Sequence, residues 1–516
     1  MFEEQGPRRV VPRWRSSTVT AKTAEAWTKP PAVGQNYAEE LAAKVREFDL
    51  SRTVPVAAEL MFLAKEVGDV ASAKRAATLI LGCAESISSS QLLRSAKRVL
   101  EGDEKDVALS SGEFVREARK LLAIDFHNPV LLMDVARELT ARHQDTAALR
   151  YVKAAVAMAP TSRFVVRAAA RYYLHIGEYD IAHDILRRTP LLSSDRWIQA
   201  SEIAVATVRG RTSELVRRTI RNLSHVEKIE PDASELASAV ATVELLSGAD
   251  KNAKRLFQKA LVQPNDNSLA QVEWAATRLK LVVDETALRT PFSFEANSNN
   301  AYRRLQIEEA IAYAKRWVTD EPFASRPHDS LCYLYCLEGR YDEARKAAEA
   351  AVRADGGLSF ALSLNLLFTK IQSGDVDAAF EELIRLGNRP EAKLHATHIL
   401  ANAGALAYAT GELTLGKEFY SRAINAARGR AEPHTEALAR AFFARAATVA
   451  SDPSAESIVL ESATSVERLP NPGAIHVMRM LVDAKRRQQL EATIFARVAK
   501  RKWQWDAASN TLRTFE

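Results

Sequence analysis

The sequence is poor in the residues that build disulfide frameworks, irregular loops and membrane spans. Its 516 residues include only 3 cysteines, 19 glycines and 18 prolines. Three cysteines are too few for a disulfide-stabilised fold, which indicates a reducing compartment. No apolar run reaches the ~18–20 residues of a membrane-spanning helix, and no apolar stretch of a secretory signal follows the N-terminal arginines. We therefore expect a cytoplasmic protein with no membrane segment.

An excess of charge of one sign is also lacking. The chain has 71 Lys and Arg residues against 65 Asp and Glu residues, a net charge of +6. Spread over this length, such a charge permits an acidic partner without requiring one.

Sequence signatures of catalysis are missing as well. The chain contains no G-x-x-x-x-G-K-[ST] loop to hold phosphates, no H-E-x-x-H zinc motif and no G-x-S-x-G nucleophile turn. We therefore expect no enzymatic activity, no catalytic residue, no metal and no cofactor.

What the sequence does contain favours helix throughout. Hydrophobic residues make up 47% and charged residues 26% of a chain rich in alanine and leucine. These are strong helix formers, and alternating β-branched runs are rare.

One short pattern recurs within this helical sequence. In LEGRYDEARKAAEAAVRAD, residues 337–355, Gly339 is followed by Tyr341 and then by small residues at Ala344 and Ala351. Copies of the pattern are found by their residue at the glycine position, here called the marker. Most steps between markers are 33 to 38 residues and one is 57. The markers are His143, Gly177, Gly210, Gly248, Leu305, Gly339, Gly374 and Gly411.

Each position in the pattern has a physical role in a helix hairpin. Glycine ends a first helix because a left-handed residue without a Cβ costs little there. Small alanines let the next helix approach its neighbours closely, and a nearby aromatic or aliphatic residue fills the remaining gap. A single hairpin cannot bury its apolar face, so successive hairpins must stack.

The pattern resembles the tetratricopeptide repeat (TPR) family. That family also has a small residue seven positions before the marker, and most of the copies match this. The consensus tryptophan of the first helix is missing in every copy, and Ile203 and Leu367 are larger than the consensus residue. The resemblance implies an all-α, right-handed superhelical solenoid with a concave groove. The matching residues are Ala136, Ala170, Ala241, Cys332 and Gly404.

The composition divides the chain into five parts. Residues 1–36 are rich in Arg, Pro, Ser and Thr without helical periodicity, which predicts a disordered basic arm. The long 57-residue step contains Phe292 and Phe294 and predicts an inserted loop between the two helices of one repeat. The expected parts are the arm 1–36, degenerate helical repeats 37–130, the TPR-like solenoid 131–430 with an insertion at 284–301, C-terminal repeats and a cap 431–490, and a basic, aromatic tail 491–516.

In the repeat frame, a row of first-helix arginines faces the groove. Guanidinium groups in such a row could grip a partner's acidic side chains or C-terminal carboxylate; the alternative is pairing with acidic residues of the same chain. We therefore expect a non-catalytic scaffold or adaptor that binds a peptide or partner protein. The candidate partner-binding residues are Arg137, Arg167, Arg171 and Arg326.

Two further features have more than one interpretation. His328, Cys332 and Cys336 share a helix face and could ligate zinc, but no fourth ligand is visible and Cys332 fills a core position of the repeat. The basic arm, and a tail with Trp503 and Trp505, could bind nucleic acid through phosphates and base stacking. The tail could instead cap the last repeat.

Overall fold

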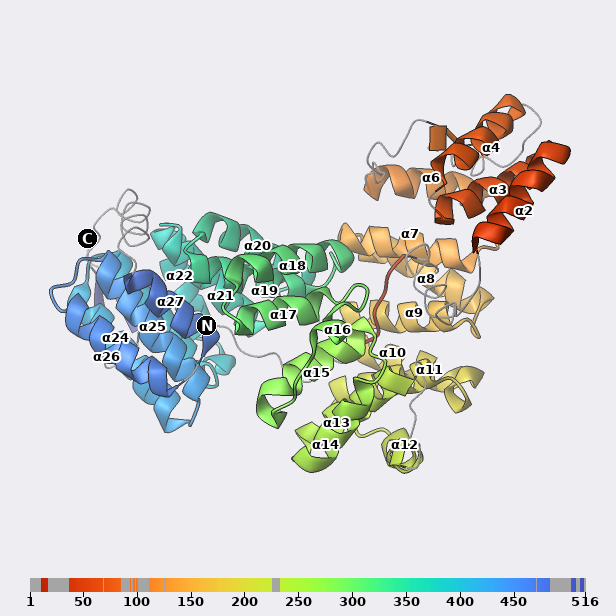
Figure 1. Cartoon of the computed structure of the whole chain (residues 1–516). Coiled ribbons are helices and arrows are strands. Elements are labelled where there is room, and N and C mark those ends of the chain that lie inside the picture. The colour runs from red at the N-terminus through yellow and green to blue at the C-terminus, as the bar shows by residue number, and fades with distance from the viewer. Residues whose placement is uncertain are drawn as a thin grey trace. The chain divides into compact units, whose positions relative to one another are not determined.

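The structure is a computed structural model of the chain (Figure 1). It describes residues 11–16, 37–67, 69–84, 93, 96–97, 99–100, 111–124, 126–224, 233–357, 359–469, 471–482, 503–506 and 511–514. The chain forms two compact units. The main unit contains residues 127–516 and the N-terminal residues 1–17, and the N-terminal unit contains residues 18–126.

The N-terminal unit is helical. Its core is built largely from alanines and medium-sized aliphatic side chains, including Ala57, Leu60, Ala73 and Ala77. Small residues at this helix contact allow α3 and α4 to pack closely. Its helices are α2 (Tyr37–Leu50), α3 (Val54–Val67), α4 (Val70–Gly82) and α6 (Ser111–Ile124).

The main unit is a succession of antiparallel helix hairpins, which confirms the all-α fold class of TPR-like repeats. Two 3-10 helices, η3 (Pro190–Ser193) and η5 (Pro390–Lys393), lie in linkers. The handedness of the superhelix remains a prediction. The hairpins pair α7 (Pro129–Ala141) with α8 (Asp145–Met158), α9 (Arg163–His175) with α10 (Tyr179–Arg188), α11 (Arg196–Val208) with α12 (Leu215–Ser224), α13 (Ser234–Leu246) with α14 (Asp250–Ala260), α17 (Phe294–Arg303) with α18 (Ile307–Asp320), α19 (Ser325–Glu338) with α20 (Tyr341–Ala354), α21 (Phe360–Gln372) with α22 (Val376–Gly387), α23 (Ala396–Ala409) with α24 (Leu413–Gly429), and α25 (Pro433–Val449) with α26 (Ala455–Arg468).

The marker residues lie at the turns of these hairpins, in the left-handed backbone region. Gly339 has a φ of 73° directly after α19, and the non-glycine marker His143 has a φ of 56° after α7. Every marker read from the sequence shares a positive φ, which confirms the physical reason for the pattern. Lys280 (φ 50°) and Ser451 (φ 52°) occupy the same conformation and were not recognised as markers.

The inserted segment 284–301 differs from the expected loop. It contains the one-turn helix α16 (Glu285–Leu288) and most of α17, and α17 is itself the first helix of the hairpin with α18. Lys280 ends the preceding helix, α15 (Asp266–Leu279), and divides the long step into 32 and 25 residues (248 to 280 and 280 to 305). The long step is therefore an extra repeat whose second helix is reduced to a single turn.

Close helix packing explains the small residues of the pattern. Ala136, Ala170 and Cys332 are fully buried. A Cβ atom added at Gly404 would lie 2.7 Å from the ring of Tyr420 on the paired helix, too close for any side chain. First helices also pack side by side: α7, α9, α11, α13, α15 and α17 in succession, and again α19, α21, α23 and α25. The first helices are together called the inner row here.

The last described helix contacts first helices from earlier in the chain. Helix α27 (Pro472–Val482) packs against α17, α19 and α25. The backbone N–H of Gly473 donates to the hydroxyl of Tyr302 at 3.1 Å, and Arg445 of α25 donates to the carbonyl of Cys336 at 2.9 Å. Within the predicted tail, strands β1 (Trp503–Asp506) and β2 (Thr511–Thr514) form an antiparallel pair. Among the described residues, no helix has both the length and the apolar character to cross a bilayer.

Candidate peptide-binding site

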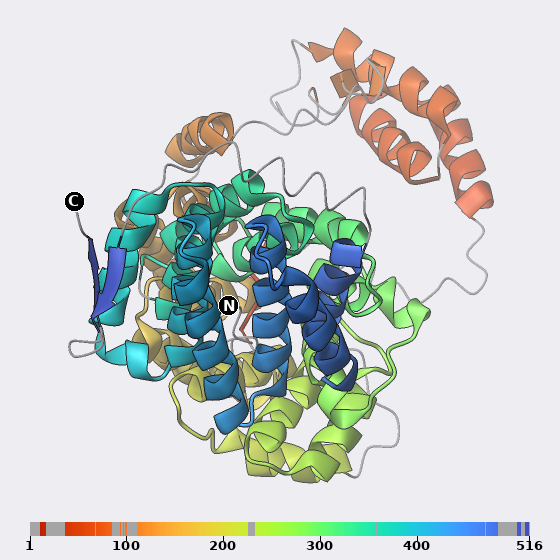
Figure 2. The same cartoon turned by 90° about the vertical axis from the view of Figure 1, so that its left-hand side faces the viewer.

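The main unit encloses an extended segment of its own N-terminus, Val11–Ser16, here called the N-terminal segment. The sequence placed these residues in a disordered arm, and for this segment that prediction is wrong. Figures 1 and 2 show the segment in dark red, surrounded by helices of the main unit. Trp14 is only 1% exposed. Burial of a large indole between aromatic rings provides the apolar gain that the composition of the arm did not suggest.

Trp14 occupies an aromatic slot between α9 and the loop after α18. Its ring centroid lies 6.2 Å from that of Tyr172 in an edge-on arrangement and 5.4 Å from that of Phe323. These separations and tilts are those of favourable aromatic pairs.

The two arginines beside Trp14 bind carboxylates from distant parts of the chain. Arg13 forms ion pairs with Glu321, with Glu295 at 2.5 Å and with Asp266 at 3.4 Å. All four side chains are at most 13% exposed, so solvent screens these pairs little.

Arg15 is held by two carboxylates, one of which, Asp266, also pairs with Arg13. Its Nε donates to Asp320 at 2.7 Å and its Nη2 to Asp266 at 2.9 Å. The guanidinium also stacks on the ring of Phe292, 4.9 Å from the centroid. Both arginines of the N-terminal segment are therefore neutralised by the main unit.

Two side chains bind the backbone of the segment independently of its sequence. Asn267 donates to the carbonyl of Val11 at 3.1 Å, and Arg137 donates to the carbonyl of Trp14 at 3.3 Å. Hydrogen bonds of this kind hold a peptide in an extended conformation whatever its side chains are.

Helix ends place the acidic groups of the site. Asp266 lies in the first turn of α15, after an N-cap and capping box formed by Asn265 and Ser268. Glu295 lies in the first turn of α17. Carboxylates are favoured there by the exposed N–H groups and the helix dipole. Glu321 directly follows α18 and receives a hydrogen bond from the indole of Trp317 at 2.9 Å.

The positive charges of neighbouring arginines offset the unfavourable burial of the Glu321 carboxylate. Burial alone would raise the pKa of Glu321, but the positive charges of Arg13 and Arg171 outweigh it and lower the pKa to about 2. For Asp320, burial outweighs the hydrogen bond and charge of Arg15, and its pKa is raised. Glu321 is thus held in its charged form, whereas burial favours the neutral form of Asp320.

The structure brings Arg137 and Arg171, two of the predicted arginines, to this site. Arg137 binds the segment directly and also donates to the carbonyl of Asp320 at 2.8 Å. Arg171 is buried, its guanidinium lies 5.0 Å from the ring centroid of Phe323, and burial lowers its pKa.

The other two predicted arginines lie on the same inner row but pair with the chain's own acids. Arg167 donates to Glu235 at 2.6 Å and lies over the ring of Trp197. Arg326 pairs with Glu295, the same carboxylate that binds Arg13. All four arginines belong to first helices, α7, α9 and α19; their role in binding a partner remains a prediction.

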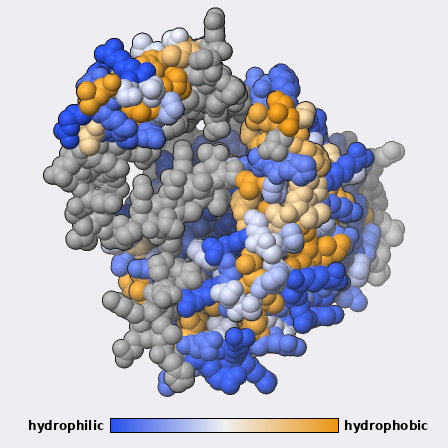
Figure 3. Space-filling view, turned by 90° about the vertical axis from the view of Figure 1, so that its right-hand side faces the viewer, coloured by the Kyte–Doolittle hydropathy of each residue, from blue (hydrophilic) through white to orange (hydrophobic). Residues whose placement is uncertain are grey.

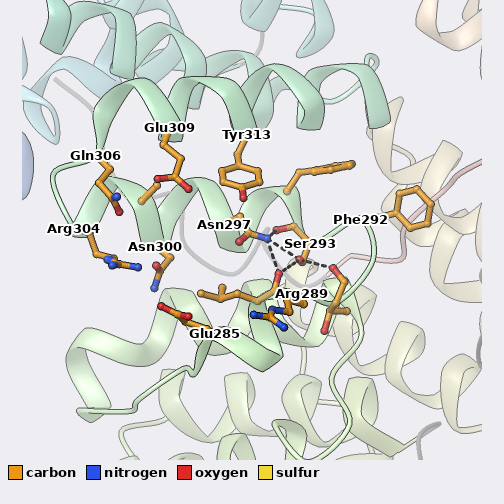
Figure 4. Close-up of a pocket in the computed structure, with 14 residues that line it drawn as sticks. Glu285, Arg289, Phe292, Ser293, Asn297, Asn300, Arg304, Gln306, Glu309 and Tyr313 are labelled. Atoms are coloured by element: carbon orange, nitrogen blue, oxygen red, sulfur yellow. Dashed lines mark hydrogen bonds between the residues drawn. The ribbon is translucent and has the colours of Figure 1, made fainter. Parts of the chain in front are cut away.

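A cavity lies beside the repeat formed by α15 and α16, whose second helix is a single turn. It has a volume of about 390 Å³ and is lined by polar residues of α16, α17 and α18, including Arg289, Asn300 and Arg304 (Figure 4). Asn297 donates to the carbonyl of Leu288 at 3.0 Å and so fixes the turn that forms its wall. Phe292 lies at its edge and carries the stack with Arg15. The cavity therefore lies where the second helix of this repeat is reduced to the single turn α16.

No catalytic arrangement emerges among the described side chains. His183 contacts Glu202 at 2.9 Å, and Ser213 donates to the other oxygen of the same carboxylate. Because Glu202 lies between the two, His183 cannot accept the serine proton as a general base. Cys332 and Cys336 are buried in the core, and no group of three or more metal-ligating side chains was found in the described part of the chain.

On the face seen in Figure 3, hydrophobic residues lie among hydrophilic ones. The most exposed large hydrophobic residues belong to different parts of the sequence. Isolated residues of this kind are normal on a folded protein. They are Leu50, Ile124, Val282, Leu394 and Leu460.

No family model matches the sequence, and no curated protein is significantly similar to it. Similar chains occur among solved structures. One, from a crystal structure of the APC/C hetero-tetramer Cut9–Hcn1, shows 14% identity over 92% of this chain and 98% of that chain, with a TM-score of 0.30. Another, from a structure of Naa15/Naa10 bound to HypK-THB, shows 12% identity over 90% and 82%, with a TM-score of 0.23.

The chain is an array of TPR-like repeats. Its own hairpins, left-handed markers and buried small residues establish this.

Sequence reasoning did not identify the carboxylates that pair with Arg13 of the N-terminal segment. Asp266, Glu295 and Glu321 are separated from Arg13 by more than 250 residues, so no local pattern connects them. The only available signal was the alternation of basic and aromatic residues in Arg13-Trp14-Arg15. These residues lie within 1–36, which the composition as a whole predicts to be a disordered arm.

Proposed function

We propose that this protein is a non-catalytic interaction scaffold, which binds an extended segment of a partner protein on the inner row of its TPR-like repeats. The observation that carries the proposal is the N-terminal segment itself. The site holds a peptide by its backbone carbonyls, by an aromatic slot and by ion pairs on both sides, which are the general means of peptide recognition.

The proposed contact residues are Arg137, Arg167, Arg171 and Arg326. Nucleic acid binding through the basic arm gains no support at Arg13 and Arg15, because their guanidinium groups are bound to carboxylates and cannot meet phosphates at the same time.

The test is affinity capture with the double variant Arg167→Glu/Arg171→Glu, followed by mass spectrometry. Proteins that bind at the site should be recovered with the unmodified chain and lost with the variant. A matched control is Arg188→Glu/Arg385→Glu, which makes the same charge change at side chains that are 82% and 59% exposed. Helicity is compared by circular dichroism. Equal recovery by both variants would place the interaction elsewhere.

A further inference from the structure

We propose that the site is built for a segment of the form Arg–aromatic–Arg from a partner protein, and that the N-terminal segment occupies it in the partner's absence. This inference rests on the proposed function, and it names the chemistry of the ligand. The sequence suggested an acidic ligand for the arginine row. The surroundings of the N-terminal segment favour a basic one.

Charge complementarity is the first argument. The surfaces that meet Arg13 and Arg15 carry four carboxylates, Asp266, Glu295, Asp320 and Glu321. An acidic peptide in the same position would bring like charges together in a poorly solvated site, which is strongly unfavourable. Arg326 and Arg171 of the main unit already face Glu295 and Glu321, and the two cations of the ligand supply the remaining positive charge.

The spacing of the contacts is the second argument. In an extended chain, alternate side chains point the same way, so Arg13 and Arg15 can reach a shared carboxylate, Asp266, at 3.4 and 2.9 Å. Trp14 points into the slot between Tyr172 and Phe323. The site therefore recognises three consecutive residues, with the aromatic one in the middle.

The imperfect fit of the N-terminal segment is the third argument. Nε1 of Trp14, Nε of Arg171 and Oε1 of Glu321 are buried and find no hydrogen-bond partner among the described residues. Trp14 and Arg171 are 1% and 8% exposed, respectively. A cavity of about 110 Å³ lies at this place, lined by residues that include Arg13, Arg171 and Glu321. Buried polar atoms without partners are costly, so a ligand with a polar group here binds more favourably.

Attachment to the same chain explains why an imperfect segment still fills the site. A tethered segment has a high effective concentration near its binding surface, commonly in the millimolar range. A partner's segment must exceed this advantage through better contacts, and it then replaces the N-terminal segment without further rearrangement of the repeats.

The experiment makes the N-terminal segment dissociable in the full chain. A protease recognition sequence is inserted after Thr23, and the folded protein is cleaved there. A fluorescent synthetic peptide of residues 9–17 is then added, and its binding is followed by anisotropy while helicity is followed by circular dichroism. We expect the peptide to replace the cleaved segment at unchanged helicity, with affinity at least about 10-fold higher than for the uncleaved chain.

Peptide variants test the chemistry. A peptide with Trp14→Ala, and a peptide with Arg13→Glu and Arg15→Glu, are each expected to bind at least about 10-fold more weakly than the parent peptide. A peptide with Trp14→Phe keeps the aromatic contact and is expected to remain within about 10-fold of the parent.

Each other outcome has a defined meaning. If the cleaved segment is not displaced, or if helicity is lost when it leaves, the segment is a fixed structural part and the inference is wrong. If the acidic peptide binds in place of the basic one, the inference fails while the proposed scaffold function stands. If neither peptide binds the cleaved chain, both fail at this site. If the uncleaved protein is a dimer that exchanges these segments between copies, the ligand is a second copy and the assignment to a partner protein is wrong.

Discussion

Glu321 is the residue on which the charge balance of the segment site depends. It is 2% exposed, pairs with Arg13 and lies within the field of Arg171. Removing it leaves both cations buried without their main counter-charge. Loss of one partner from a buried pair typically costs about 3–5 kcal/mol.

We therefore expect Glu321→Gln to lower the free energy of unfolding by about 3 kcal/mol at pH 7. The pH dependence follows from the depressed pKa. A carboxyl with a pKa of about 2 in the folded protein and 4.5 when unfolded stabilises the fold above pH 4.5, and this contribution is lost as the pH falls towards 2. The difference between the variant and the parent should therefore shrink over this window. Urea unfolding at several pH values, followed by circular dichroism, measures it.

Glu461→Gln is the matched control for this change. Glu461 also pairs with an arginine, Arg440, but its side chain is 75% exposed. Surface pairs contribute about 0–1 kcal/mol, so this variant should behave like the parent at every pH. A Glu321→Gln variant that is equally insensitive would show that the site does not contribute to stability.

At the residue scale, the repeat frame predicted which helices carry the arginines, but not which acidic residues pair with them. The repeat frame predicted that Arg137, Arg167, Arg171 and Arg326 belong to first helices, and they lie in α7, α9 and α19. That they share a groove-facing side remains a prediction. Their counter-ions depend on how the row curves and on where the N-terminus returns. Those features are set by long-range packing, which a local pattern does not encode.

At the scale of single elements, each repeat is marked by a left-handed residue in the turn after its first helix. The markers could be recognised from sequence wherever glycine occupies the left-handed position, because glycine adopts it at little cost. Lys280 escaped recognition because any residue can adopt φ of 50° if packing demands it. With this marker missed, the sequence predicts a loop at 284–301, where the structure has α16 and most of α17.

Lys280→Gly should stabilise the protein. Lys280 is exposed at the left-handed C-cap of α15, so the substitution removes backbone strain and leaves the core untouched. We expect a gain of about 0.5–1 kcal/mol in the free energy of unfolding. The same substitution at Lys346, which is exposed in the middle of α20, should cost about 1 kcal/mol. Thermal unfolding of the two variants should therefore shift in opposite directions, and shifts of equal sign would contradict this interpretation of the turn.

Helix packing within a hairpin gives a second prediction at this scale. A Cβ atom added at Gly416 of α24 would lie 2.6 Å from the ring of Tyr408 on α23, whereas one added at Gly429, at the end of the same helix, would meet nothing within 4 Å. Gly416→Ala should therefore destabilise the protein by about 1–3 kcal/mol through overpacking. Gly429→Ala should be neutral or slightly stabilising. Similar unfolding midpoints for the two variants would show that the hairpin tolerates wider separation.

At the scale of the whole molecule, the chain is divided into two compact units, and the N-terminal segment belongs to the unit that begins at His127. The sequence order is therefore interrupted, because residues 18–126 form the N-terminal unit between the segment and the repeats that bind it. Stack-like repeat arrays depend mainly on contacts between neighbouring repeats. The main unit should therefore not require the N-terminal unit in order to fold.

We expect a fragment from His127 to Glu516 to fold on its own and to be stabilised by the peptide of residues 9–17. Ligand binding to the folded state alone adds about 2.7 kcal/mol when the peptide is at 100 times its dissociation constant. The midpoint of thermal unfolding should thus rise with peptide concentration, and the Trp14→Ala peptide should raise it less. The control is a full chain lacking only residues 1–16, which keeps the N-terminal unit and should match the unliganded fragment. A fragment that is far less stable than this control would mean that the two units fold as one, and a midpoint that ignores the peptide would mean that the segment does not bind when detached.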